Sequence, residues 1–96
     1  MRRSPLEMYV EILSVLAHNG PLKLTLIMYK ANLNCSVLKE DLGFLAKQGL
    51  VEEHTIRKTR KVFIVTQRGI NVLKYFRELK QALPIVEEAQ NQSIPF

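Results

Sequence analysis

The chain has 96 residues, of which 47% are hydrophobic and 24% are charged. This length supports one modest hydrophobic core, and the composition excludes wholesale disorder. Fourteen Lys and Arg residues against nine Asp and Glu residues give a formal net charge of +5, which favours a polyanionic partner such as nucleic acid.

A strong helix start follows a short basic tail at residues 1–3. Ser4 is a good N-cap, Pro5 suits the first helical position, and Glu7 is placed to complete a capping box. From there to His18 the sequence is apolar around most of the helical circumference. Such a helix packs on more than one side, so we expect it to be the central element of the fold.

A helix-turn-helix arrangement is predicted next. Asn19, Gly20 and Pro21 end the first helix, and a short second helix begins at Lys23 or Thr25 and runs to Ala31, with Leu26, Ile27 and Tyr29 at core or flanking positions. A turn of three residues, Asn32 to Asn34, leads into a third helix that Asn34 caps and Gly49 ends.

The third helix has two different faces. Leu38, Leu42 and Leu45 share one face and predict a contact with the core. The opposite face is small and polar, as a recognition helix requires, and carries Ser36, Lys39, Glu40, Gly43 and Lys47. Phosphate would repel Glu40 unless its carboxylate accepts a hydrogen bond from a cytosine amino group. Gly43 either permits a close approach of the backbone or is merely tolerated.

The periodicity then changes to that of a β-hairpin. Residues 50–55 and 62–66 are typical of strands, and residues 56–61 between them include four cations. We therefore predict a hairpin with a strongly basic tip.

A long helix is predicted over residues 67–90, with Thr66 as its N-cap and Ile70 and Leu73 facing the core. A second apolar series has heptad spacing, and we predict that another copy of the chain covers it; it consists of Val72, Phe76, Leu79, Leu83 and Val86. The alternative is that this series folds back on Met8 and Val15. Pro84 predicts a kink or a break, and residues 91–96 a flexible tail.

The predicted fold is mostly α with a small β-hairpin, in the order α-α-α-β-β-α of a winged helix-turn-helix, with residues 4–66 as the core of the domain. This arrangement suits double-stranded DNA, whose major groove admits one helix and whose phosphates attract cations. The predicted DNA-binding residues are Lys23, Thr25 and Lys30 on phosphates, Asn34, Ser36, Lys39, Glu40 and Gly43 in the groove, and Arg57, Lys58, Arg60 and Lys61 on the backbone or minor groove.

Several short motifs resemble those of small archaeal winged-helix DNA-binding regulators that dimerise through a long C-terminal helix. The matching segments are RSPLE at residues 3–7, IMYKANL at 27–33, KQGLV at 47–51 and TQRG at 66–69, together with Leu38, Leu42 and Leu45. The resemblance covers residues 3 to about 86 and implies a homodimeric, regulatory DNA-binding protein. It does not supply a target site.

Other functions are weaker expectations. A protein-interaction module on the same fold is the main alternative, because folds do not dictate functions. We do not expect an enzyme, because the sequence contains no recognisable set of catalytic residues. We expect no cofactor or small-molecule ligand, and no metal site either, because His18 and His54 have no cysteine or carboxylate near them at the spacing of metal ligands.

Cys35 is interpreted as a small packing residue rather than a redox sensor. A single cysteine, together with the absence of a signal peptide or a membrane span from the sequence, indicates the cytoplasm. The aromatic side chains of Tyr9, Tyr29, Phe44 and Phe63 are expected in the core or at its flank, not as base-stacking platforms.

Overall fold

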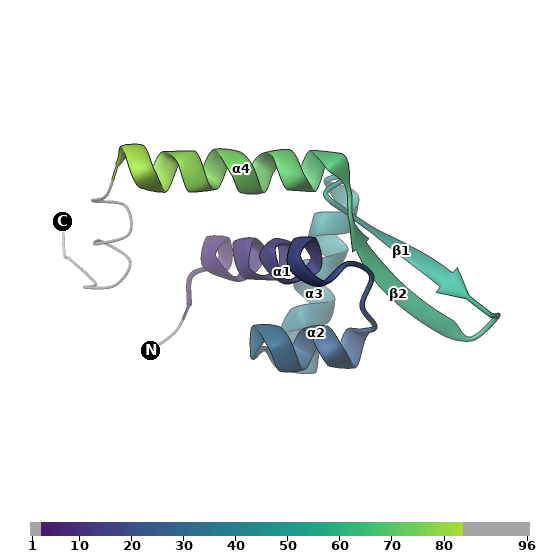
Figure 1. Ribbon diagram of the computed structural model, residues 1–96. Helices are drawn as coiled ribbons and strands as arrows, with labels where there is room; N and C mark the ends of the chain where they lie inside the picture. The colour runs from purple at the N-terminus through teal and green to yellow at the C-terminus, as the bar shows by residue number, and fades with distance from the viewer. Residues whose placement is uncertain (1–2, 84–96) are drawn as a thin grey trace.

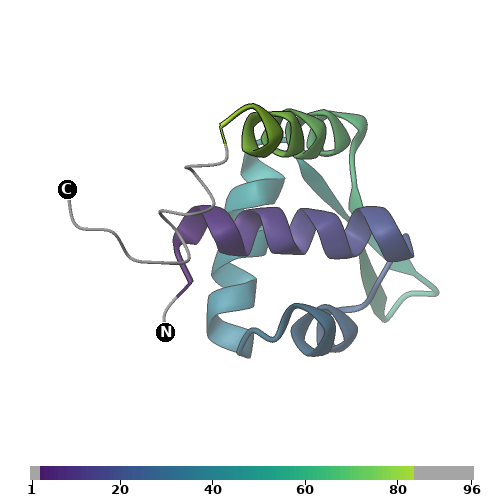
Figure 2. The same cartoon turned by 60° about the vertical axis from the view of Figure 1, so that its left-hand side comes forward.

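The computed structural model describes residues 3–83, which form helices and one two-stranded antiparallel sheet in the predicted order α-α-α-β-β-α. The elements are α1 (Pro5–Asn19), α2 (Leu24–Ala31), α3 (Cys35–Lys47), β1 (Val51–Ile56), β2 (Arg60–Val65) and α4 (Gln67–Ala82). In Figures 1 and 2, α1 lies between α4 on one side and α2 on the other, α3 crosses behind it, and the hairpin extends away from the helices. The predicted fold class is confirmed.

Helix α1 forms the centre of the core, as predicted. Ile12, Leu13 and Leu16 are fully buried, and the helix contacts α2, α3, α4 and β2. Burial of a large aliphatic side chain contributes about 1.5–3 kcal/mol, so these contacts dominate the stability of the domain. The other buried hydrophobic residues of this cluster are Leu22, Ile27, Leu38, Leu42, Leu45, Val51 and Leu73.

Three of the helices begin at the side-chain caps that the sequence predicts. At α1 the Ser4 hydroxyl accepts from the Glu7 backbone N–H at 3.1 Å, and the Glu7 carboxylate accepts from the Ser4 N–H at 3.0 Å. Asn34 caps α3 by accepting from the Val37 N–H at 2.9 Å. Because each cap satisfies an otherwise unpaired N–H, these residues fix where the helices start.

The connections that end α2 and α3 use left-handed backbone conformations. Asn32, in the turn between the two helices, has a φ of +55°, which asparagine adopts more readily than most residues. Gly49, after α3, has a φ of +75°, where glycine is the favoured residue. Gly49 was predicted to end the third helix, whereas the sequence did not single out Asn32 within its turn.

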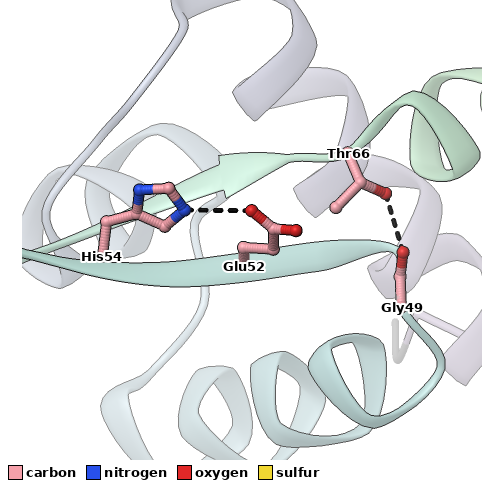
Figure 3. Close-up of polar contacts among 4 residues, drawn as sticks. All are labelled: Gly49, Glu52, His54 and Thr66. Atoms are coloured by element: carbon pink, nitrogen blue, oxygen red, sulfur yellow. Dashed lines mark hydrogen bonds and ion pairs between the residues drawn. The ribbon is translucent and has the colours of Figure 1, made fainter.

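A tight junction joins the end of α3 to the start of α4 across the base of the hairpin. The Thr66 hydroxyl donates to the Gly49 carbonyl at 2.7 Å (Figure 3). The same hydroxyl accepts from the Gly69 N–H at 3.0 Å. The Thr66 N–H donates to the Leu50 carbonyl at 3.0 Å. A Cβ atom at Gly69 would overlap the Leu50 carbonyl oxygen, so only glycine allows α4 to approach the chain this closely.

The predicted boundaries of the hairpin were wrong at its tip. Ile56, Arg60 and Lys61 belong to the strands, and the turn contains only residues 57–59. Arg57 and Lys58 have φ values of +51° and +65°. Positive φ at two successive turn residues matches the right-handed twist of paired strands, but the usual Asn-Gly or Asp-Gly signal is missing from this sequence.

The structure describes α4 as far as Ala82, with Leu83 as its C-cap. Leu73 is buried and Ile70 partly buried, which confirms their predicted place facing the core. The predicted extension of the helix to residue 90, the kink or break at Pro84, the contact at Val86 and the flexible tail at 91–96 lie outside the described residues.

Asp41 is a charged residue in the buried face of α3. Its side chain is only 7% exposed, and its Oδ2 atom has no hydrogen-bond partner within residues 3–83. Burial raises the pKa of the Asp41 carboxyl above its ordinary value, and the charge of neighbouring Glu40 raises this pKa further.

Replacement of Asp41 by Asn is expected to stabilise the domain by about 1–2 kcal/mol at pH 7, because it removes a buried, unpaired charge. The folded state binds the Asp41 proton more tightly than the unfolded state does. The charge therefore destabilises the fold above the raised pKa, and this penalty disappears as the pH falls towards the ordinary value. Urea unfolding should show the difference between Asp41→Asn and wild type shrinking as the pH falls.

Glu40→Gln is a suitable control for this measurement, because Glu40 is exposed and acts on Asp41 only through its charge. Glu40→Gln should also raise the free energy of unfolding at pH 7, but by less than Asp41→Asn does. A constant difference between Asp41→Asn and wild type from pH 7 down to pH 4 would contradict this account of Asp41.

Candidate nucleic-acid interface

The face of α3 opposite its leucines is exposed. Ser36, Lys39, Glu40 and Gly43, all predicted groove contacts, lie on this side of the helix together with Ala46 and Lys47. Leu38, Leu42 and Leu45 hold the other side in the core. The exposed side is therefore fixed in direction by the packing of the buried side.

A groove of about 450 Å³ separates α3 from the hairpin; we call it the recognition groove. Lys39, Gly43 and Ala46 line it from α3, and Glu53, Lys61 and Phe63 line it from the strands, with Leu24 and Leu42 at its base. The Lys61 ammonium lies 3.8 Å from the Glu53 carboxylate, and the two side chains are 65% and 45% exposed. This ion pair is weak in water, so Lys61 remains available to another anion.

The strand register explains which side chains reach this groove. Glu53 pairs with Phe63 and Thr55 with Lys61, so these residues share the face of the hairpin that looks toward α3. Arg60, paired with Ile56, lies on the opposite face. Consequently Lys61 lines the recognition groove and Arg60 does not.

A second groove of about 630 Å³, which we call the wing groove, lies between the start of α2 and β2. Lys23 and Thr25 line it on one side, and Arg60 and Lys61 on the other. Leu24 and Lys61 line both grooves, so the two adjoin. The side chain of Lys23, the N-cap residue of α2, makes no capping hydrogen bond, which leaves the N-terminal dipole of this helix open to an anion.

A backbone bridge holds the wing groove in shape. The Leu22 N–H donates to the Phe63 carbonyl at 3.1 Å, and the Phe63 N–H donates to the Leu22 carbonyl at 2.8 Å. This isolated bridge adds the segment before α2 to the edge of β2. It therefore brings Lys23 and Thr25 beside the wing, although they are far from it in sequence.

The structure separates some predicted site residues from these grooves. Lys30 is exposed in the last turn of α2 and lines neither groove. The side-chain oxygen of Asn34 is used in capping α3. Tyr29 is 84% exposed, so the predicted core or flanking position was wrong for this residue. Leu26 is 40% exposed and lines the wing groove, so it is not a core residue. The short α2 helix has only Ile27 and Ala31 in the core.

Phe44 and Tyr9 confirm the flanking role predicted for them. Their rings stack with centroids 4.8 Å apart and connect α3 to α1. Phe44 is 43% exposed, so this pair forms the rim of the core. Phe63 is partly buried against the core, and Cys35, a free thiol, is partly buried.

An apolar stripe on α4 remains exposed although the helix packs on α1. It consists of Val72, Tyr75, Leu79 and Leu83, which are 37%, 69%, 45% and 48% exposed, and we call it the α4 stripe. Phe76, which the heptad spacing included, is instead half-buried, with the Lys80 ammonium 5.7 Å from its ring centroid. Tyr75, which the heptad spacing of the sequence did not identify, occupies the position in the α4 stripe that was predicted for Phe76.

The part of the chain that the structure describes has no cluster of three or more metal-ligating side chains, and it has no helix long and apolar enough to cross a membrane. His54 forms an exposed pair with Glu52 at 2.9 Å on β1 (Figure 3). This pair lies on the face of the hairpin opposite Glu53.

Known structures share this architecture. A MarR-family transcriptional regulator from Silicibacter pomeroyi superposes with a TM-score of 0.72 at 20% identity, over 83% of this chain and 53% of that one. MepR, a transcription regulator of the Staphylococcus aureus multidrug efflux pump MepA, superposes with a TM-score of 0.72 at 16% identity, over 86% of this chain and 63% of MepR. The Zalpha domain of Carassius auratus PKZ, solved in complex with Z-DNA, superposes with a TM-score of 0.59 at 19% identity, over 65% of this chain and 97% of that domain.

These likenesses show the fold, and the chain spans only about half the length of the Silicibacter regulator. No curated protein matches the sequence. The family comparison is more direct, because the model of the winged helix-turn-helix family matches residues 2–83, which is most of the chain. The protein belongs to the winged helix-turn-helix family.

Proposed function

We propose that this protein is a homodimeric regulator that binds double-stranded DNA, with α3 in the major groove and the wing on the adjacent backbone or minor groove. The family and its regulator-like structural neighbours support DNA binding and transcriptional regulation. The placement in the grooves and the dimer are inferred from the geometry below.

The observation that carries the proposal is the pair of adjoining grooves. The exposed side of α3 borders the recognition groove, and cations from three elements border the two grooves together: Lys39 from α3, Lys23 beside α2, and Arg60 and Lys61 from β2. A helix about 10–12 Å across fits a major groove about 12 Å wide. The phosphates at the edge of that groove would then meet the wing and the start of α2.

Within this arrangement the polar side chains divide into two roles. Ser36, Lys39 and Glu40 are exposed on α3 and can reach base edges, with Glu40 accepting only from a cytosine amino group. Lys23, Thr25, Arg60 and Lys61 line the wing groove and suit phosphates. Arg57 and Lys58 occupy the turn of the hairpin, which extends away from the helices (Figure 1).

The α4 stripe supports the homodimer. Four exposed apolar side chains at spacings of three, four and four residues form a continuous surface on one side of α4. Isologous packing of two such stripes would remove this surface from water and present two copies of α3 to one duplex.

The wing is tested by neutralising its turn. Arg57→Ala/Lys58→Ala should weaken duplex binding and reduce the slope of log K against log salt by about 0.9 for each phosphate that the variant no longer neutralises. Fluorescence anisotropy with genomic fragments, titrated at several salt concentrations, measures both quantities.

A matched control is Lys74→Ala/Arg77→Ala, which also removes one Lys and one Arg. Both residues are exposed on α4, on the other side of that helix from the α4 stripe, and line neither groove. Equal losses of affinity in the two double variants would mean that only net charge matters, and the proposed wing contact would be rejected.

Gly43 tests the approach of α3 to the duplex. No atom lies within 4 Å of a Cβ built at this position, so Gly43→Ala should stabilise the helix by about 1 kcal/mol. We expect its duplex affinity to fall by about tenfold, because the new methyl group projects into the recognition groove. Thermal unfolding and anisotropy measure the two effects; unchanged affinity would show that Gly43 is merely tolerated.

The dimer is tested at Leu79. The wild-type chain should have about twice the monomer mass of 11.1 kDa in sedimentation equilibrium, and Leu79→Glu should move it towards the monomer. Gln81→Glu, which adds the same charge on the other side of α4, should leave the dimer intact. A wild-type mass of 11.1 kDa at every concentration would contradict the dimer.

A protein-interaction module is a second candidate function, favoured by the exposure of Leu26 and Tyr29 on α2. Large exposed apolar side chains often mark protein contacts. No duplex binding at about 50 mM salt, where phosphate contacts are strongest, would favour this second function over the first.

A further inference from the structure

The side chain of Arg3 contacts the turn of the helix-turn-helix. Its Nη1 atom donates to the Ala31 carbonyl at 2.7 Å, and its Nη2 atom donates to the Asn32 carbonyl at 2.5 Å. The two ends of this contact are 28 and 29 residues apart in sequence. One planar guanidinium therefore links the residue before the N-cap of α1 to the carbonyls of the last residue and the C-cap of α2.

These carbonyls need an external donor. Helix α2 ends as Asn32 turns to a φ of +55°, and the Asn32 and Leu33 N–H groups both donate back to the Met28 carbonyl. The chain then leaves the helix, so the Ala31 and Asn32 carbonyls have no N–H further along the helix to accept from. A cation is also favoured at this end by the helix dipole.

The clamp that Arg3 forms on these two carbonyls lies close to the start of the recognition helix. A cleft of about 570 Å³ lies beside it, lined by Arg3, Pro5, Met8, Asn32, Leu33, Asn34 and Val37. Asn34, the N-cap of α3, is only two residues beyond the Asn32 carbonyl. Because the turn is this short, the orientation of its peptide groups determines the direction in which α3 leaves it.

We propose that Arg3 is a positioning residue for DNA recognition, which sets the angle of α3 by holding the turn rather than by contacting a phosphate. The inference rests on the proposed DNA-binding function and deepens it. Arg3, the last residue of the N-terminal basic tail, has two of its donors committed within the fold.

Salt dependence distinguishes the two roles of this arginine. Arg3→Ala should lower duplex affinity by about tenfold, measured well below the melting temperature, with the slope of log K against log salt unchanged. Arg3→Lys keeps the charge but not the planar fork, so it should lose nearly as much affinity. A phosphate contact would instead give a slope reduced by about 0.9 in Arg3→Ala and near-normal binding in Arg3→Lys.

Hydrogen exchange tests the clamp without DNA. In Arg3→Ala the amides of Leu33 and Val37, which bond to Met28 and to the Asn34 side chain, should exchange faster than in the control Arg77→Ala. The amides of the buried part of α1 should exchange at the same rate in both variants.

Three results would overturn the proposal: a reduced salt slope, an unchanged affinity of the folded Arg3→Ala variant, or unchanged exchange at Leu33 and Val37. Failure of the wild-type chain to bind any duplex is a different result. It would reject the proposed function and with it a role of Arg3 in DNA recognition, while the exchange rates would still show whether Arg3 holds the turn.

Discussion

The close approach of α4 to the end of α3 is the constraint on which the rest of the structure depends. Gly69 lies against the Leu50 carbonyl, where no side chain fits, and Thr66 bonds both to Gly49 and to Gly69. The two ends of the hairpin are thereby held together at its base. Because α3 enters this junction and α4 leaves it, the same contact sets where the wing lies beside the recognition helix and how α4 lies along α1.

The two grooves follow from that junction and from strand alternation. Lys61 and Glu53 share the hairpin face toward α3, whereas Arg60 lies on the other face. The bridge between Leu22 and Phe63 then adds the start of α2, so cations from separate segments meet around Leu24 and Lys61. A duplex bound here would meet cations from α2, α3 and the wing together, which is how a small domain can gain affinity from phosphates while one helix reads bases.

Several locally unfavourable features occur in the elements assigned to DNA recognition. Asp41 is a buried acid in α3, Gly43 interrupts the same helix, and Arg57 and Lys58 adopt left-handed conformations at the turn of the wing. Each is less stable than an obvious alternative residue type. Conflicts between local preference and fold tend to occur where a protein performs its function. Gly43, Arg57 and Lys58 lie at the proposed interface, whereas Asp41 lies on the buried side of the same helix.

The sequence by itself determined the order of the elements, the caps at Ser4, Asn34 and Thr66, and the two faces of α3, because these depend on residues within a few positions of each other. Only the tertiary structure decided which cations meet, that Tyr75 replaces Phe76 in the α4 stripe, that Asp41 is buried, and that Arg3 contacts a turn 28 residues away. These features depend on how helices rotate against one another and how strands pair. Local periodicity carries little information about such long-range contacts, since many packings satisfy the same pattern of apolar residues.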